Sequence, residues 1–519
     1  MPFPSISHLV IRLIVPAIFF PVIFPISRAT RINCGSSIRT SINGLEFLPD
    51  ANFTTAGTPR AVSFVELPSP LLFTVRSFPL AINKKFCYVV PTIRSTNYLV
   101  RTTYYYGAVN GPKFPSPPVF DQIIDGTIWR LVNTIDDYRR NKSTYYEGVF
   151  MSKGKSMSVC VGTNNLTESD PFISALEVVM LPYSVYNSTD FTKYGLSLVT
   201  RSNFGYNGSS IRYPDDQFDR IWEPFEGTLT GSKSTNSNAI VSGIWNLPPL
   251  KVFATEMTSS SVPLTINWPP SPLPLPNSSY YMAFYFATNG SFIPVRQPVF
   301  DIIVNNVAFY RNLHVTEEGL AVFSGNWSLG GNTTISLIPA AGSSAASFNA
   351  GELFTVLSLG RRTLVRDVLA LENIRNNISN PPLDWSGDPC VPQQYSWTGV
   401  LCSEGKRVRV VTLNLTGMEL AGSLSPSIAR LTALTDIWLA NNKFSGSIPE
   451  LKPLKQLKRL HLENNQLTGS IPSSLGDNKR LTELFLQNNN LSGHIPSSLS
   501  AKKGLDLRTS GNPLLNPSP

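Results

Sequence analysis

Residues able to perform acid–base or metal chemistry are few in this chain. The histidines are His8, His314, His461 and His494. Their spacing contains neither HxxxH nor HExxH, the patterns that hold a metal or place a general base. Two aspartate pairs offer glycosidase-like carboxylates in principle: Asp121 with Asp125, and Asp215 with Asp216. Because the first pair flanks a predicted strand end and the second lies in a predicted turn, we favour structural roles and predict no enzyme, metal or cofactor.

Aromatic clusters at two predicted strand ends offer a different chemistry, the binding of sugar. They are Tyr104, Tyr105 and Tyr106 before Gly107, and Tyr285 with Phe286 before Asn289-Gly290. Aromatic rings stack on the C–H faces of sugars, so these five residues form a candidate carbohydrate-binding site. Alternation along a strand makes Tyr105 face opposite to Tyr104 and Tyr106, however, so part of the cluster is expected in a core.

The elements that would position these residues are short strands. From residue 31 to about 360, runs rich in Val, Ile, Phe, Tyr and Thr are broken every ten residues or so by Gly, Pro or Asn, which predicts an all-β sandwich. Examples are residues 97–106, 279–287 and 353–359. The segment PVFD occurs at Pro118–Asp121 and again at Pro298–Asp301, an offset of 180 residues. We therefore predict two tandem β-sandwiches, at about 31–185 and 186–360, rather than one large sheet.

Helical periodicity first becomes clear at residues 363–377, where apolar residues recur at three- and four-residue steps. We interpret residues 361–384 as a helical linker. Beyond it, Leu415, Leu439, Leu462 and Leu486 are spaced 24, 23 and 24 residues apart within the frame LxxLxLxxNxLxGxIP. This period predicts a short leucine-rich-repeat solenoid in residues 385–519, with Asn442, Asn465 and Asn489 satisfying backbone groups between coils.

The non-leucine positions of each repeat strand predict a concave face with three columns. The central column is Asn414, Trp438, His461, Phe485; the flanking columns are Thr412, Asp436, Arg459, Glu483 and Thr416, Ala440, Glu463, Gln487. An aromatic centre with alternating charges beside it is typical of a binding surface for a peptide or protein. The candidate partner-binding residues are Asp436, Trp438, Arg459, His461, Glu483 and Phe485. The alternative that Trp438 and Phe485 only cover neighbouring side chains stays open.

The compartment is predicted by three features of the sequence. Residues 1–29 have Arg12 before an apolar run and a small-residue cleavage site, which indicates a signal peptide; prolines in the run argue against a membrane anchor. Twelve Asn-x-Ser/Thr sequons are candidate glycosylation sites: Asn52, Asn141, Asn165, Asn187, Asn207, Asn277, Asn289, Asn326, Asn332, Asn377, Asn414 and Asn490. Five cysteines match no zinc pattern. We expect a disulfide between Cys390 and Cys402. We suggest a second disulfide between Cys34 and Cys87, which would make Cys160 the odd thiol.

The charged fraction and the net charge limit the kinds of partner that the chain is expected to bind. Charged residues make up 15% of the 519 residues, well below typical soluble domains, and the formal net charge is +9. Positive charge permits contact with acidic polymers or acidic partners. The basic residues are spread along the chain without an aromatic-interleaved stripe, so we predict no nucleic-acid partner.

Several segments resemble the plant malectin-like ectodomain, a tandem of two malectin folds. They are RINCGSS at Arg31, FISALEVVMLP at Phe172, RYPDDQFDRIWEP at Arg212 and the repeated PVFD. The WSGDPC and WTGVLC segments, at Trp385 and Trp397, resemble the cysteine cap of a plant leucine-rich repeat. The resemblance spans residues 30–360 for the malectin-like part. It implies a receptor-like protein without its own kinase, mainly β, on the extracellular face.

Two functions follow as alternatives. The first is a non-enzymatic ectodomain that recognises an extracellular peptide or a receptor kinase partner. The second is a lectin whose sandwiches bind a cell-wall glycan. We expect membrane association only through an uncleaved N-terminal segment or through an anchor beyond Pro519.

Overall fold

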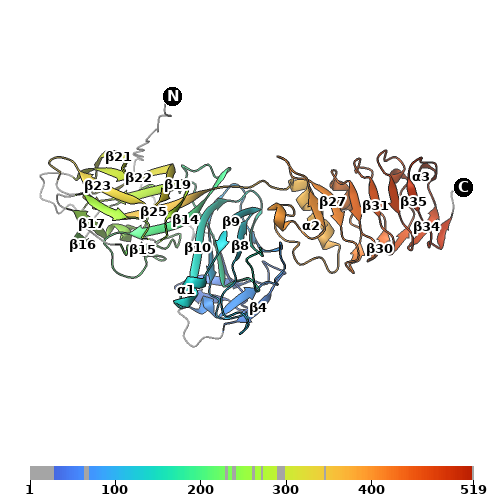
Figure 1. The fold of residues 1–519 in the computed structure, drawn as a ribbon, viewed down its shortest axis with the longest axis horizontal. Helices are drawn as coiled ribbons and strands as arrows, with labels where there is room; N and C mark the ends of the chain where they lie inside the picture. Colours follow the sequence, from blue (N-terminus) through green and yellow to red (C-terminus); the bar gives the residue numbers. More distant parts are fainter. Residues whose placement is uncertain are drawn as a thin grey trace, which may run out of the picture.

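The computed structural model describes residues 29–62, 69–227, 232–235, 241–259, 263–270, 273–288, 298–343 and 346–516. The predicted signal peptide and the sequon at Asn289 lie outside these ranges, apart from Ala29. In Figure 1 two β-rich lobes stand beside each other, and an elongated repeat domain extends from one of them toward the C-terminus. The chain is mainly β, as predicted, with a repeat solenoid at its C-terminal end. No helix among the described residues is long and apolar enough to cross a membrane.

One 11-stranded sheet runs through both lobes. Its strand order is β2(Thr40–Ile42), β3(Leu45–Pro49), β1(Ala29–Asn33), β13(Ala175–Met180), β7(Asn97–Tyr104), β10(Thr144–Met151), β14(Tyr194–Asn203), β25(Ala350–Ser358), β19(Leu275–Phe286) and β22(Leu320–Gly331), with β15(Glu223–Pro224) beside β14. The lobes join where β10 pairs with β14. Two tandem sandwiches were predicted rather than one large sheet. The two lobes form, but main-chain pairing continues across their junction and makes one sheet common to both.

Smaller sheets complete each lobe. The first lobe has β6(Lys85–Pro91), β11(Ser156–Gly162), β8(Phe120–Ile124), β9(Thr127–Val132), then β12(Phe172–Ile173), β5(Thr74–Ser77), β4(Thr58–Ala61) and the helix α1(Ile135–Arg139). The second has β18(Leu264–Asn267), β23(Thr334–Pro339), β20(Val299–Val304), β21(Val307–His314), then β16(Ser232–Thr235), β17(Thr255–Ser259) and β24(Ala346–Phe348). Phe120 of β8 and Phe300 of β20 occupy the third strand of their four-stranded sheets, and each strand pairs with the next one along the chain.

A row of buried charges crosses the shared sheet from one lobe to the other. Its members alternate in sign along neighbouring strands: Arg31, Glu177, Arg101, Glu147, Arg201 and Glu352. Each is at most 9% exposed at the side chain, and the ion-pair distances run from 2.6 to 3.3 Å. The β-ladder register places Arg31 opposite Glu177, Glu177 and Glu147 opposite Arg101, and Arg201 opposite Glu352. We call these six residues the charge row.

The RYPDDQFDRIWEP segment contributes buried ion pairs to the same region. Asp219 accepts hydrogen bonds from Arg101 at 3.1 Å and from Arg212 at 2.9 Å, while buried Asp216 binds Arg220 at 2.9 Å and the Trp222 indole N–H at 2.9 Å. Burial by itself raises the pKa of Asp219, but hydrogen bonds from Arg212 and the charges of both arginines outweigh it and hold the pKa below its ordinary value. This segment is therefore an ionic part of the lobe core.

The repeat domain is a parallel solenoid with two sheets. One sheet, which we call the strand face, consists of β26(Val400–Cys402), β27(Val410–Asn414), β29(Asp436–Trp438), β31(Arg459–His461), β33(Glu483–Phe485) and β35(Asp506–Arg508). The other consists of β28(Ala421–Ser423), β30(Lys443–Ser447), β32(Gln466–Gly469), β34(Asn490–His494) and β36(Leu514–Asn516), and α3(Ser497–Ser500) precedes the last coil. The counted leucines are at most 2% exposed.

The predicted asparagine ladder forms as expected. The side-chain amide of Asn442 donates to the carbonyls of Leu415 and Leu439 at 2.8 and 3.0 Å, and its oxygen accepts from Leu420 N–H at 2.9 Å. Asn465 and Asn489 make equivalent bonds, and Asn512 continues the ladder one coil further. These bonds satisfy backbone groups that the leucine core would otherwise leave unpaired.

The helix expected as a linker is instead part of the solenoid. It is α2(Val365–Asn376), and its Ala370, Leu371 and Ile374 belong to the same buried cluster as the repeat leucines. Its Asp367 is fully buried and accepts from Arg409 at 2.8 Å. Helix α2 therefore closes the apolar end of the solenoid.

Two disulfides are present, one as predicted. Cys390 bonds Cys402, with Cα atoms 5.8 Å apart. The second joins Cys87 to Cys160, so the expected pair of Cys34 with Cys87 is wrong. Cys87 and Cys160 face each other directly in the β6–β11 ladder, a strand pairing that the linear order of cysteines does not reveal. Cys34 is a buried thiol, and burial raises its pKa above the ordinary value.

We predict that Glu147→Gln lowers the free energy of unfolding by about 3–5 kcal/mol, because it leaves two buried arginines short of a counter-charge. Urea unfolding of the secreted chain measures this. Asp136→Asn is the matched control: it also removes one carboxylate charge, but from an exposed pair with Arg139, and should cost less than about 0.5 kcal/mol. Equal losses in the two variants would contradict a structural role for the charge row.

We further predict that alkylation of the native protein labels no cysteine, and that denaturation without reduction exposes Cys34 alone. Peptide mapping by mass spectrometry identifies the labelled residue. Labelling of Cys390 or Cys402 in the folded protein would show that the cap disulfide is absent.

Candidate recognition surfaces

Parallel pairing stacks one aromatic column on the strand face. The register aligns Asn414, Trp438, His461, Phe485 and Arg508 across successive coils. The His461 ring stacks on Phe485 with centroids 4.2 Å apart and lies 6.2 Å from Trp438, and the Arg508 guanidinium lies 4.1 Å over the Phe485 ring. All three rings are half-buried. The column is thus a continuous ridge of flat groups open on one side.

The predicted flanking charges bind one another around this column. Asp436 pairs with Arg459, whose guanidinium also lies 5.1 Å over the Trp438 ring, and Glu483 lies 2.9 Å from His461 Nε2. Burial raises the pKa of Asp436, but hydrogen bonds from Arg459 and Thr435 outweigh it and lower the pKa overall. The six candidate residues Asp436, Trp438, Arg459, His461, Glu483 and Phe485 therefore form one cluster.

Two features of this surface escaped the sequence prediction. Arg508 extends the column because Leu507 takes the position of Leu484, 23 residues later and within the period; the counted leucine position after Leu486 holds Thr509 instead. The Trp438 indole N–H and a Glu463 carboxylate oxygen are covered atoms without a hydrogen-bond partner among the described residues.

The tyrosine platform predicted on the sandwiches does not form. Tyr104, Tyr105, Tyr106, Tyr285 and Phe286 are each at most 1% exposed. Tyr285 donates to buried Glu352 at 2.5 Å, and Tyr105 donates to Asn141 at 2.6 Å. The prediction was wrong because these residues are covered on all sides: the three tyrosines pack together in one core, whereas Tyr285 and Phe286 pack in two different cores.

The eleven sequon asparagines that the structure describes are all exposed. Asn277 lies on β19, Asn326 lies on β22, and Asn332 follows β22 directly; the two strands pair with each other, and β22 is an edge of the shared sheet. In the solenoid, Asn414 ends β27 and Asn490 begins β34. Exposure is what glycan attachment requires, and glycosylation remains a prediction.

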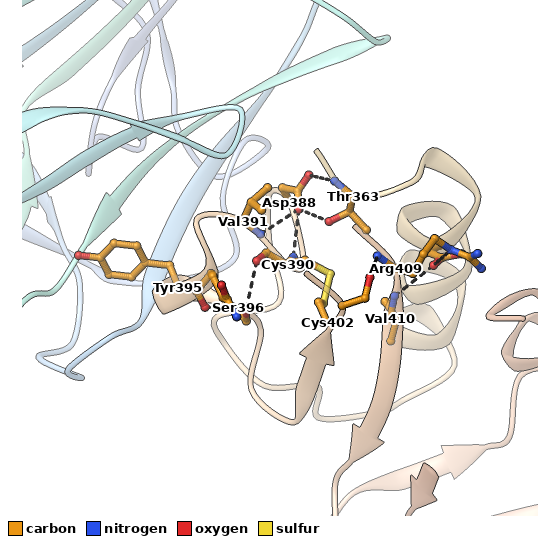
Figure 2. Close-up of a disulfide and its surroundings, with 12 residues drawn as sticks. Thr363, Asp388, Cys390, Val391, Tyr395, Ser396, Cys402, Arg409 and Val410 are labelled. Atoms are coloured by element: carbon orange, nitrogen blue, oxygen red, sulfur yellow. Dashed lines mark hydrogen bonds and ion pairs between the residues drawn. A yellow bond between two sulfur atoms is a disulfide. The ribbon is translucent and has the colours of Figure 1, made fainter. Parts of the chain in front are cut away.

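A buried lysine fixes the solenoid cap to the first lobe. Lys85 of β6 donates to the carbonyls of Asp388, Val391 and Tyr395, at 2.7, 2.8 and 2.8 Å. Burial lowers the pKa of Lys85 to about 8, so the ammonium form persists at neutral and acidic pH. Its three N–H groups match these three carbonyls, of which Val391 and Tyr395 lie inside the loop that the Cys390–Cys402 disulfide closes and Asp388 lies just before it. Figure 2 shows this disulfide with Asp388, Val391 and Tyr395 around it.

Tyr395 forms the second contact of this junction. Figure 2 shows its ring directed away from the disulfide toward the strands of the first lobe, where its hydroxyl donates to Asp121 at 2.6 Å. Asp125 forms an ion pair with Arg362, next to the solenoid helix. The Asp121 and Asp125 carboxylates therefore join two domains, and Asp215 pairs with Lys251 at the surface. None of the described residues forms a metal-binding cluster of His, Cys, Asp and Glu.

Two β-lobes that share one sheet, joined by buried contacts to a capped repeat solenoid, have the architecture of a receptor-like ectodomain. The chain belongs to the malectin-like family: the model described as "Malectin-like domain" matches residues 32–356. The "Leucine rich repeat N-terminal domain" matches residues 365–403, which include α2, and "Leucine Rich Repeat" matches residues 456–478 and 480–501.

Relatives with both parts are plant receptor kinases. A "Probable LRR receptor-like serine/threonine-protein kinase" of Arabidopsis thaliana is 30% identical over 475 residues, covering 85% of this chain and 48% of its own length. A "Leucine-rich repeat receptor-like serine/threonine-protein kinase" of the same plant is 31% identical over 431 residues, 78% of this chain and 47% of the relative. The chain thus spans about half the length of these relatives, in their ectodomain region.

Solved structures share the fold. The ANX2 ectodomain from Arabidopsis thaliana superposes with a TM-score of 0.53 at 14% identity, covering 64% of this chain and 97% of that one. The plant receptor-like kinase ANX1 gives 0.52 at 16% identity, covering 63% and 97%. These relatives are consistent with a cell-surface location.

We predict that Lys85→Met lowers the free energy of unfolding by at least about 2 kcal/mol, because three buried carbonyls lose their donor. It should also speed proteolysis between residues 357 and 364. Lys84→Met is the control, since Lys84 lies 3.4 Å from Asp384 at a partly exposed site and should cost under about 1 kcal/mol. A Lys85 variant that unfolds and is cleaved like the wild type would show that the junction does not depend on this ammonium.

Proposed function

We propose that the protein is an extracellular, non-enzymatic receptor-like ectodomain that binds a peptide or protein partner on the strand face of its solenoid. The observation that carries this proposal is the column of Trp438, His461, Phe485 and Arg508. Rings of this kind provide large contact area for little loss of conformational entropy.

The charges of the strand face support specificity rather than raw affinity. Arg459 and Asp436 are paired before any ligand arrives, as are His461 and Glu483. A ligand that exchanges these pairs gains little net energy, because each new contact replaces an existing one. We therefore assign the larger share of partner affinity to the rings and the choice among partners to the charges.

The absence of catalysis belongs to the same proposal. The carboxylates that could have formed a glycosidase pair already bind arginine, lysine or tyrosine side chains. The alternative lectin function loses its basis in the sandwiches, since the aromatic residues proposed for sugar stacking are buried in the described lobes.

The test is a capture screen with the full secreted chain against extracellular peptide fractions and receptor ectodomains, followed by titration of each recovered partner. We predict that Trp438→Ala weakens binding by about 2 kcal/mol or more, whereas Gln487→Ala, beside the column, costs under about 0.5 kcal/mol. The Trp438 side chain is half-buried on the surface and outside the leucine core, so the variant should remain folded by circular dichroism.

Two results would overturn the proposal. One is unfolding of the solenoid in Trp438→Ala, which would make this side chain structural. The other is unchanged affinity of the folded variant for every partner recovered, which would move the binding surface elsewhere.

A further inference from the structure

Strand β22 is a long edge of the shared sheet. It pairs with β19 on one side, and no strand pairs with its other side in the part of the chain that the structure describes. Its 12 residues include no charged residue and no proline. Residues Leu320–Ser324 keep a regular register with β19, and the ladder becomes irregular at the next two residues. The outer N–H and C=O groups of β22 are therefore a template on which another strand can pair.

The other edge strands of the described sheets are shorter or carry residues that oppose pairing. Apart from β22, the edge strands with more than four residues are β6, β9 and β21. They contain Pro91, Arg130 and Arg311 respectively. Proline lacks an N–H for a ladder, and a charged side chain makes the approach of a second strand costly. Strand β22 is the longest of the four and has neither protection.

Four predicted glycosylation sites surround this edge. Asn326 lies on β22, Asn332 follows β22 directly, and Asn277 lies on β19. Asn187 precedes Ser188, whose carbonyl oxygen would lie 3.7 Å from a Cβ at position 325 of β22. All four asparagine side chains are exposed. Sites for large hydrophilic groups are thus gathered around the long edge strand that has no charge of its own.

The Asn326 side chain is oriented for attachment. Its amide oxygen accepts a hydrogen bond from the Ser279 hydroxyl, and its Nδ2 makes no hydrogen bond among the described residues. Ser279 pairs with Ser328 in the ladder, and the next pair, Tyr280 with Trp327, packs into the core on the opposite face of the sheet. A group attached to Asn326 therefore extends from the open face, directly beside the unpaired edge.

We propose that N-linked glycans at Asn187, Asn277, Asn326 and Asn332 prevent β22 from pairing with the β22 of a second copy of this chain. Antiparallel pairing of two identical edges would continue the shared sheet from one molecule into the next. At about 3.3 Å per residue, Ala321 lies about 17 Å along the strand from Asn326, so a branched oligosaccharide at Asn326 hinders the approach of a strand over the regular segment.

The attachment step is an ordinary group transfer of the secretory pathway. A bond forms between the asparagine Nδ2 and the anomeric carbon of the first sugar, and the nitrogen loses a proton. The donor is a lipid-linked oligosaccharide, whose lipid pyrophosphate is the leaving group. The proposal rests on the extracellular location given under the proposed function, but it does not depend on the strand face.

The experiment measures self-association of the full secreted chain by sedimentation velocity over a range of concentrations. The edge variant, N187Q/N277Q/S328A/N332Q, removes all four sequons, because Ser328 is the third residue of the Asn326 sequon. The matched control, N52Q/N165Q/N207Q/N490Q, removes four other exposed sequons. We expect the edge variant to associate at least about tenfold more tightly than the wild type, and the control to stay within about threefold of it.

A third variant separates strand pairing from a general loss of hydrophilic sugar. N187Q/N277Q/S328K/N332Q lacks the same glycans as the edge variant but has a lysine within β22. Because a charge in an edge strand opposes pairing, we expect its association to return to within about threefold of the wild type. Hydrogen exchange locates the contact: the amides of residues 320–331 should exchange more slowly in the associated edge variant than in the wild type.

Trimming of the folded wild-type chain with an endoglycosidase that leaves one sugar at each site gives the same test without any substitution, and should also cause association. Four unmodified asparagines in a peptide map of the secreted chain would overturn the proposal. Equal association of the edge variant and the control, no effect of the lysine, or slowed exchange only outside β22 would each contradict it. Association of the fully glycosylated chain through β22 would show that this edge is a dimer interface instead. None of these results depends on whether Trp438→Ala weakens partner binding, so the two proposals fail separately.

Discussion

The alternating charge row constrains the rest of the malectin-like part. Six buried ionised side chains are costly unless each contacts an opposite charge; the four inner members contact one on each side, and the two end members, Arg31 and Glu352, contact one each within the row. Glu147 illustrates the balance: burial raises its pKa, yet Arg201 and Arg101 outweigh burial and hold it below the ordinary value. Because Glu147 lies on β10 and Arg201 on β14, the row is satisfied only when the two lobes share one sheet, so it fixes their relation to each other.

A second constraint, the buried contacts of Lys85, fixes the position of the solenoid relative to the first lobe. Lys85 lies on β6 of the first lobe, and its acceptors lie in the disulfide-closed cap. A buried ammonium tolerates little displacement, because a shift that breaks even one of its bonds leaves a charge undersolvated. Gly387 adds a steric limit, since a Cβ there would lie 2.7 Å from Cys87 Sγ. The first lobe and the solenoid cap are therefore held in one arrangement by buried contacts.

The sequence predicted the parts that depend on local periodicity and missed those that depend on tertiary pairing. The leucine spacing and the asparagine ladder could be read directly, because each coil repeats the same local contacts. Tyr105 and Tyr285 could not be placed, since a strand end looks the same whether one face or both are covered. Cys87 and Cys160 are 73 residues apart, and only the pairing of β6 with β11 brings them together. The RYPDDQFDRIWEP segment contributed to the family resemblance, but its role as a source of buried counter-charges depends on strands from elsewhere in the chain.

Within each coil of the solenoid, the polar residues of the surface occupy positions different from those of the leucine core and the asparagine ladder. The leucines fill the core and the asparagines form the ladder, so the residue types at these positions are fixed. The residue types at the outward strand positions and in the turn before each strand are not fixed in this way. The strand positions hold rings and mutually paired charges, a composition suited to a partner with defined shape. The turn before each strand holds exposed lysines, among them Lys455 and Lys479. Because the strands of successive coils pair in parallel register, each added coil lengthens the strand face by one strand spacing and adds one position to its central column, so the number of coils sets how long a partner that column can contact.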